Sequence, residues 1–93
     1  MIGYIYKTTN LINLKIYIGQ KTSEIFMPHY FGSGTKIKHA IKKYGVDNFK
    51  VELIEECFTL KDLDDREIYW IKFYNATDRD IGYNIMAGVI FIH

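Results

Sequence analysis

The chain has 93 residues, enough for one small domain. Its 48% hydrophobic and 25% charged residues exclude a disordered protein, and its single cysteine, Cys57, excludes a disulfide framework and a cysteine-based zinc site. We expect Cys57 to be a small buried thiol.

The net charge of +1 conceals an asymmetry: residues 1–50 carry eight lysines and two acids, whereas residues 51–93 carry four basic and nine acidic residues. A basic half suits a polyanion and an acidic half could supply a metal ligand, but both could equally be solvated faces of one domain.

The first 19 residues predict a β-hairpin. Residues 3–8 and 15–19 are rich in aromatic and β-branched residues, and an Asn-Leu-Ile-Asn sequence with turn chemistry lies between them. A connection centred between Leu11 and Ile12 places Tyr6 directly opposite Tyr17, with both rings on one face of the sheet.

The middle of the chain predicts a loop, a helix and a strand. Proline and glycines make residues 20–34 irregular. Apolar residues at helical spacing then predict a helix over residues 35–44 with a basic exposed surface, ended by Gly45 in the left-handed conformation. Alternating residues predict a third strand over residues 49–54.

A second helix is predicted over residues 60–74, with Thr59 and Asp62 as a variant of the capping box. At about 100° per residue, Glu67 falls in the middle of its apolar stripe, which consists of Leu60, Leu63, Trp70, Ile71 and Tyr74. A carboxylate facing a core needs a cation, hydrogen-bond donors or a metal. Pairing with Lys or Arg, or a position at a half-wet edge of the core, would satisfy Glu67 equally well.

The end of the chain predicts little regular structure. Residues 75–81 are polar and looped, and Ile85–Ile92 is an apolar run that could form a strand. Eight residues are too short to cross a bilayer, and no basic leader precedes an apolar stretch at the start, so we expect a cytosolic protein without a membrane partner. Because the chain stops within an apolar stretch, the sequence is also compatible with a fragment of a longer protein.

Four sequence elements resemble the GIY-YIG nuclease superfamily. Tyr4-Ile5-Tyr6 and Tyr17-Ile18-Gly19 resemble its paired motif, although Tyr4 stands where the first Gly is usual. Arg66-Glu67-Ile68-Tyr69-Trp70-Ile71 resembles the helix that bears the family's metal-binding Glu, and Gly82-Tyr83-Asn84 resembles its late Asn motif. The resemblance covers residues 3 to about 88, and phage-type and intron-encoded homing endonucleases are the most similar members.

The resemblance implies a single α/β domain over residues 1–93, with a small three-stranded antiparallel sheet flanked by helices. Relatives commonly attach a separate DNA-recognition segment, and we expect none within these 93 residues. It implies a DNA endonuclease, in a phage or bacterial host cell, that hydrolyses phosphodiester bonds with one Mg²⁺ or Mn²⁺ held by Glu67. Tyr17 would be the general base or water-positioning residue, and Tyr6 would orient the water or the scissile phosphate. Asn84 would fix the site geometry or contact phosphate, Gly19 would let the backbone turn beside the site, and Tyr30 would contact substrate.

One position departs from the family pattern. Members usually carry an Arg about eight residues beyond the second motif, where this chain has Met27. Transition-state charge must then be met by another cation, for which the candidates are Lys21, His29, Lys36 and Lys38. Lys36 and Lys38 are also candidates for phosphate binding. Two other functions therefore stay open: a DNA-binding module of the same fold that does not cut, and a structural or protein-interaction domain.

Overall fold

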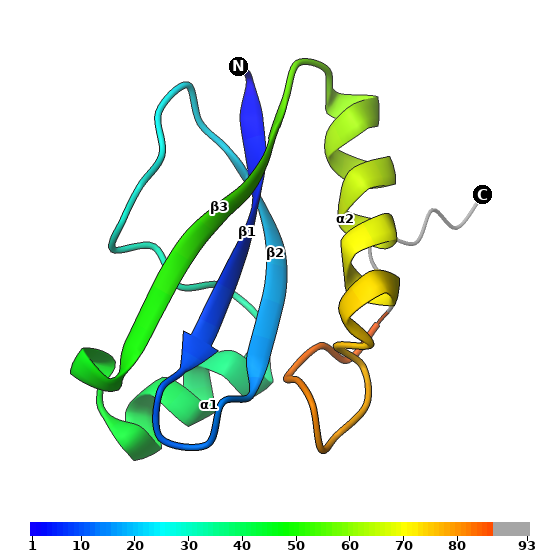
Figure 1. Cartoon of the computed structure of the whole chain (residues 1–93). Helices are drawn as coiled ribbons and strands as arrows, with labels where there is room; N and C mark the ends of the chain where they lie inside the picture. Colours follow the sequence, from blue (N-terminus) through cyan, green and yellow to red (C-terminus); the bar gives the residue numbers. More distant parts are fainter. Residues whose placement is uncertain (87–93) are drawn as a thin grey trace.

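The computed structural model describes residues 1–86, which form an antiparallel three-stranded sheet with helices against it (Figure 1). The strand order is β2-β1-β3, so the first strand is central and the other two are edges. The predicted α/β fold is confirmed. Its elements are β1 (Gly3–Asn10), β2 (Ile16–Thr22), α1 (Thr35–Tyr44), the 3-10 helix η1 (Val46–Asn48), β3 (Phe49–Cys57) and α2 (Leu60–Tyr74).

The hairpin is confirmed, but its predicted register is wrong by two residues. The Asn10 N–H donates to the Lys15 carbonyl, which closes a four-residue loop in which Leu14 has a φ of 64°. Tyr17 therefore lies opposite Thr8, not Tyr6. Because a shift of two residues preserves the side-chain alternation, the Tyr6 and Tyr17 rings still share one face, with centroids 6.3 Å apart.

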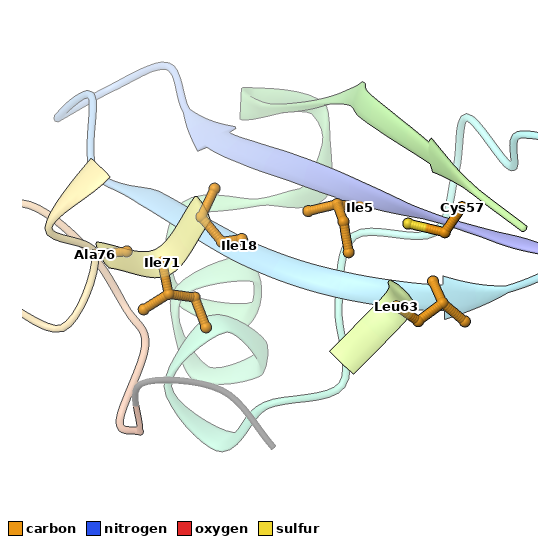
Figure 2. Packing of buried hydrophobic residues seen from close by; sticks show 6 residues of the cluster. All are labelled: Ile5, Ile18, Cys57, Leu63, Ile71 and Ala76. Carbon is orange, nitrogen blue, oxygen red and sulfur yellow. The ribbon is translucent and has the colours of Figure 1, made fainter. Parts of the chain in front are cut away.

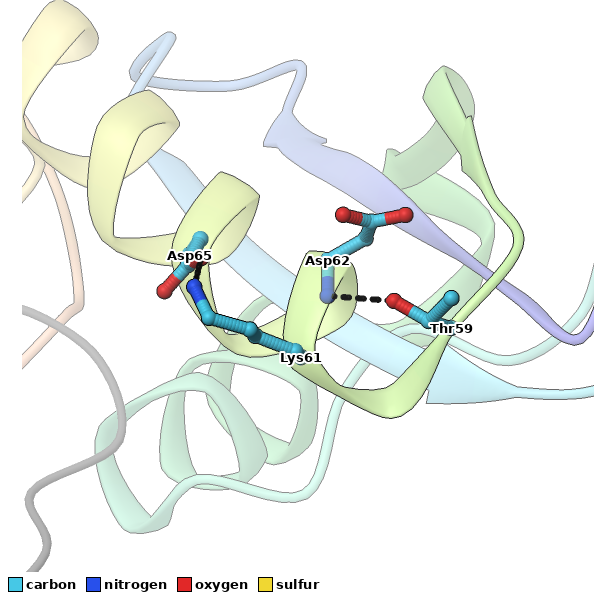
Figure 3. A network of polar contacts seen from close by, with 4 residues as sticks. All are labelled: Thr59, Lys61, Asp62 and Asp65. Atoms are coloured by element: carbon cyan, nitrogen blue, oxygen red, sulfur yellow. Dashed lines mark hydrogen bonds and ion pairs between the residues drawn. The ribbon is translucent and has the colours of Figure 1, made fainter.

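Both helices have the predicted bounds because their end signals are local. Gly45 ends α1 with a φ of 88°, and its N–H donates to the Ile41 carbonyl. Figure 3 shows the start of α2, where the Thr59 hydroxyl accepts a hydrogen bond from the Asp62 N–H at 3.0 Å. One residue of the predicted stripe is wrong: Leu60, the first residue of α2, is 67% exposed because it precedes the turns that reach the sheet.

Two hydrophobic clusters lie on opposite faces of the sheet. Figure 2 shows the larger one, in which Leu63 and Ile71 of α2 pack with buried side chains of the strands. Cys57 belongs to this cluster and is 2% exposed, which confirms the expected buried thiol. On the other face, Ile37 and Ala40 of α1 pack with Phe49.

The segment after α2 returns to the outer edge of β2. The Ile16 N–H donates to the Ile81 carbonyl at 3.1 Å, and the Tyr83 N–H donates to the Ile16 carbonyl at 2.8 Å. Gly82 forms a parallel bridge with Ile16. This segment therefore acts as a short partner for β2 and brings the late Asn motif beside the sheet edge.

The observed strands differ from the predicted ones at three boundaries. β2 continues through Thr22, so only residues 23–34 of the expected irregular stretch lack strand or helix, and β3 continues beyond residue 54 to Cys57. Ile85 and Met86 do not form a strand, and residues 87–92 of that expected strand lie outside the described residues. Within residues 1–86, none of the helices has the length and apolar character that a bilayer crossing requires.

Candidate active site

A hollow of about 410 Å³ opens at the outer edge of β2. It collects residues from four stretches of the chain, and they include Tyr17 and Glu67, two of the residues that the sequence singled out for chemistry. Its walls include Tyr17, Gly34, Thr35, Glu67 and Asn84. Tyr17 belongs to the α1 face of the sheet and Glu67 to α2 on the other face, so the two side chains meet only because β2 is an edge strand.

Glu67 lies in the apolar stripe of α2, one turn before the buried Ile71, and is half-buried. Its carboxylate accepts a hydrogen bond from the Gln20 side chain at 3.2 Å. No Lys or Arg of residues 1–86 lies within 4 Å of it, so the alternative of an ion-paired Glu is wrong for this part of the chain. Burial raises the pKa of Glu67, and the neighbouring Asp64 carboxylate raises it further.

Tyr17 presents its phenol to the same hollow. Its ring packs against the glycine-rich segment before α1, where a side chain on Gly34 would lie 3.0 Å from the Tyr17 hydroxyl. Burial raises the pKa of Tyr17, the Glu67 charge adds to this, and a backbone hydrogen bond from Gly34 opposes it. At neutral pH the phenol therefore keeps its proton and can donate a hydrogen bond.

Tyr6 lies behind Tyr17 and does not line the hollow. It is 1% exposed, and its ring packs edge-on to Tyr30 with centroids 5.6 Å apart. Burial is the main reason that its pKa is raised well above the usual range, with further contributions from Tyr17, Tyr30 and Glu67. Tyr6 therefore does not reach the hollow itself, and its expected role in orienting water or the scissile phosphate stays a prediction; its ring packs against the Tyr17 phenol that does line the hollow.

The reason for a glycine at position 19 differs from the expected one. Gly19 lies within β2, opposite Tyr6, and the backbone does not turn there. A Cβ at this position would lie 2.3 Å from the Tyr6 hydroxyl oxygen and 2.4 Å from Cζ. Gly19 thus makes room for the Tyr6 ring, and no turn beside the site is involved.

The Asn84 side chain binds the segment after α2 to the edge of β2. Its side-chain oxygen accepts from the Ile18 N–H at 2.9 Å, and its side-chain nitrogen donates to the Ile18 carbonyl at 2.7 Å. The amide therefore pairs both backbone groups of one β2 residue, as a neighbouring strand would. Of the two expected roles, this geometry matches fixing the site; contact with phosphate stays a prediction, since the amide nitrogen has a second N–H besides the one that Ile18 accepts.

The four candidate cations are spread around the molecule. Lys21 is half-buried, and its Nζ lies 4.3 Å from the centroid of the Tyr30 ring, beside the tyrosine cluster. His29 is exposed in the loop and Lys38 is exposed on α1, and neither lines the hollow. Lys36 is exposed and lines a different hollow. Met27 is 40% exposed; its backbone N–H donates to the Tyr4 hydroxyl, and its carbonyl accepts from the Tyr30 N–H.

Sequence reasoning missed two polar residues beside Glu67. The Gln20 side-chain amide donates to both Asp64, at 3.0 Å, and Glu67. Two signals were available: Gln20 shares a strand face with the buried Ile18, and Asp64 stands three residues before Glu67 on the same side of a helix. Among residues 1–86, however, no three His, Cys, Asp or Glu side chains gather as a metal cluster.

Known proteins similar to this chain are phage endonucleases. Endonuclease segA of Enterobacteria phage T4 is 33% identical over 98 aligned positions that cover 91% of this chain and 44% of that protein. Putative endonucleases segE and segD of the same phage are 46% and 52% identical over 60% and 54% of the chain, and over 27% and 22% of their own lengths. The chain thus spans less than half the length of these curated relatives. No protein-family model matches it.

The fold is also that of a solved catalytic domain. A mutant form of the catalytic domain of intron endonuclease I-TevI superposes with a TM-score of 0.71 and 25% identity, covering 98% of this chain and all of that one. A second structure of this domain gives a TM-score of 0.66 over 90% of the chain. Together with the four motifs in their predicted order, these similarities show that the chain is a GIY-YIG domain of the homing-endonuclease type.

Proposed function

We propose that this domain is the catalytic part of a divalent-metal-dependent endonuclease that hydrolyses DNA phosphodiester bonds. The observation that carries the proposal is the meeting of the Glu67 carboxylate and the Tyr17 phenol in one hollow, from opposite faces of the sheet. The relatives named as endonucleases support the reaction class. The seg endonucleases come from Enterobacteria phage T4, which supports action within a phage-infected bacterial cell.

The residues of the hollow fit a hard divalent cation. Glu67 is a half-buried carboxylate whose pKa is raised, and no cationic side chain of residues 1–86 lies within 4 Å of it. Magnesium and manganese favour oxygen ligands, and Mg²⁺ keeps several waters, so one carboxylate with substrate phosphate oxygens can suffice. We propose that Glu67 holds Mg²⁺ or Mn²⁺, which would stabilise phosphate charge and lower the pKa of bound water.

Tyr17 acts beside Glu67 as a hydrogen-bonding group. Because burial and the Glu67 charge both raise its pKa, the phenol donates to the attacking water or to a phosphate oxygen. Neutralising the Glu67 charge would remove one of the two causes that raise the Tyr17 pKa. The lower pKa would bring the phenol closer to acting as a base. Tyr6 holds the Tyr17 ring in place from behind.

The test is a plasmid-nicking assay with and without Mg²⁺. Glu67→Gln should lower the rate to below about one hundredth of the wild-type rate while duplex binding persists, because it removes a metal ligand and little volume. Asp64→Asn is the matched control: it also changes a carboxylate that binds Gln20, but Asp64 does not line the hollow, so its rate should fall much less. Loss of binding together with cleavage would show instead that Glu67 is structural.

Tyr17→Phe tests the second residue of the hollow. The substitution removes only the hydroxyl, so the rate should fall by about 100-fold or more with little change in melting temperature. An unchanged rate would exclude Tyr17 from the mechanism. Single substitutions of Lys21, Lys36 and Lys38 by Gln should then identify the cation that replaces the family Arg as the largest rate loss.

A second function is favoured by one observation: Met27 occupies the usual Arg position, and no Arg of residues 1–86 lines the hollow. A module that binds DNA without cutting it would lack that cation. Duplex binding at low salt without any Mg²⁺-dependent nicking would establish this function. Absence of both binding and nicking would favour a structural or protein-interaction domain.

A further inference from the structure

A second hollow, of about 340 Å³, lies next to the first and has a different character. Three segments far apart in the sequence form it: the hairpin loop, α1 and the loop that follows α2. Each segment contributes at least one cation, so the cationic lining does not come from one helix face alone. The cations are Lys15, Lys36, Lys43 and Arg79, and His39 lies among them.

The charge of this basic hollow is not neutralised within residues 1–86. No carboxylate lines it, and none of its four cations takes part in a salt bridge in that part of the chain. Asp78 and Asp80 flank Arg79 in sequence but do not line the hollow. Four like charges around one cavity repel one another, and a bound polyanion would relieve that repulsion.

Tyr83 is the wall that the two hollows share. Its hydroxyl accepts hydrogen bonds from the Asn10 amide at 3.0 Å and from the Asn13 amide at 3.2 Å, which hold the ring in one position. The basic hollow therefore lies directly beside the hollow that contains Tyr17 and Glu67. Adjacent sites of this kind suit a ligand that carries a row of phosphates at short intervals.

We propose that the basic hollow binds the phosphodiester backbone of the DNA strand next to the bond that is cut. The inference rests on the proposed endonuclease function and adds to it the path of the strand, over Tyr83 and toward α1. Lys15, Lys43 and Arg79 become phosphate-binding residues, and Lys36 acts there and not at the reacting phosphate. Because such contacts read no bases, they contribute affinity and register but no sequence preference.

The experiment measures the salt dependence of binding to a fluorescent 20-base-pair duplex by anisotropy, without divalent metal and in the Glu67→Gln background. Adding Lys43→Gln and Arg79→Gln should reduce the slope of log Kd against log[KCl] by about two, because two phosphate contacts are lost. Adding Lys42→Gln and Lys72→Gln is the matched control. It removes the same charge from two exposed lysines that line neither hollow, one of them adjacent to Lys43.

A control pair that changes the slope as much as the hollow pair would overturn the inference, since binding would then follow net charge alone. The endonuclease proposal would survive that result if the wild type still nicks plasmid with Mg²⁺. No duplex binding in the Glu67→Gln background at low salt, together with no nicking by the wild type, would overturn both. If the Lys43/Arg79 variant does not fold, Lys15→Gln with Lys36→Gln tests the opposite wall with the same expected slope change.

Discussion

Gly19→Ala should destabilise the domain through one buried contact. The new Cβ would lie 2.3 Å from the hydroxyl oxygen and 2.4 Å from Cζ of Tyr6, more than 1 Å inside an ordinary carbon contact. Tyr6 is 1% exposed, so its ring has little space into which it can withdraw. Overpacking of this kind costs about 1–3 kcal/mol, and each kcal/mol lowers the melting temperature of a domain this size by about 4–8 °C.

A double-mutant cycle measured by urea denaturation isolates the clash. In a Tyr6→Val background the ring is gone, so the cost of Gly19→Ala should fall to within about 0.5 kcal/mol of zero. In a Tyr6→Phe background Cζ remains 2.4 Å from the new Cβ, so most of the cost should persist. Equal costs in the Val and wild-type backgrounds would refute the reasoning and point to the β2 backbone instead.

Three further predictions concern stability. Asn84→Ala should cost about 2–4 kcal/mol in urea denaturation, because both backbone groups of Ile18 at the sheet edge lose their partner. Asn84→Asp should cost at least as much, because one oxygen of its buried carboxylate would face the Ile18 carbonyl. Burial raises the pKa of Glu67 above its ordinary value of 4.5. In the pH window just above 4.5, the folded protein therefore binds more protons than the unfolded chain does, and the free energy of unfolding falls as pH rises through that window. Glu67→Gln should therefore raise the melting temperature at pH 7 without divalent metal, and the gain should shrink as pH falls through the window; a gain that is the same at all pH values would contradict this. Thr59→Ala should lower stability by about 1 kcal/mol through the lost cap on the Asp62 N–H, whereas Thr59→Ser should be nearly neutral.

The features that the sequence predicted well depend on near neighbours in the chain. Helix α2 begins after Thr59 and α1 ends at Gly45 because capping is decided within one turn. The central place of Glu67 in its stripe follows from helical geometry in the same way. Leu60 shows the limit of that reasoning, since a helical angle does not say which turns reach the sheet.

The features that the sequence missed depend on where segments meet in space. The hairpin register depends on the left-handed φ of 64° at Leu14. A leucine gives no sequence signal for that conformation, as a glycine or asparagine would. The reason for Gly19 is a tyrosine on the neighbouring strand, and the partners of Glu67 include Gln20 from an edge strand. That Tyr17 and Glu67 meet across a sheet edge could be expected only from the resemblance, not from either pattern alone.

The way in which residues 81–84 pair with β2 has a consequence for behaviour at high concentration. An open strand edge offers a template on which other chains can add and aggregate. The backbone pairing of Ile16 and the amide of Asn84 close the β2 edge from Ile16 to Ile18. We therefore expect Asn84→Ala samples to form β-rich aggregates on storage more readily than Thr59→Ala samples, which keep that edge closed.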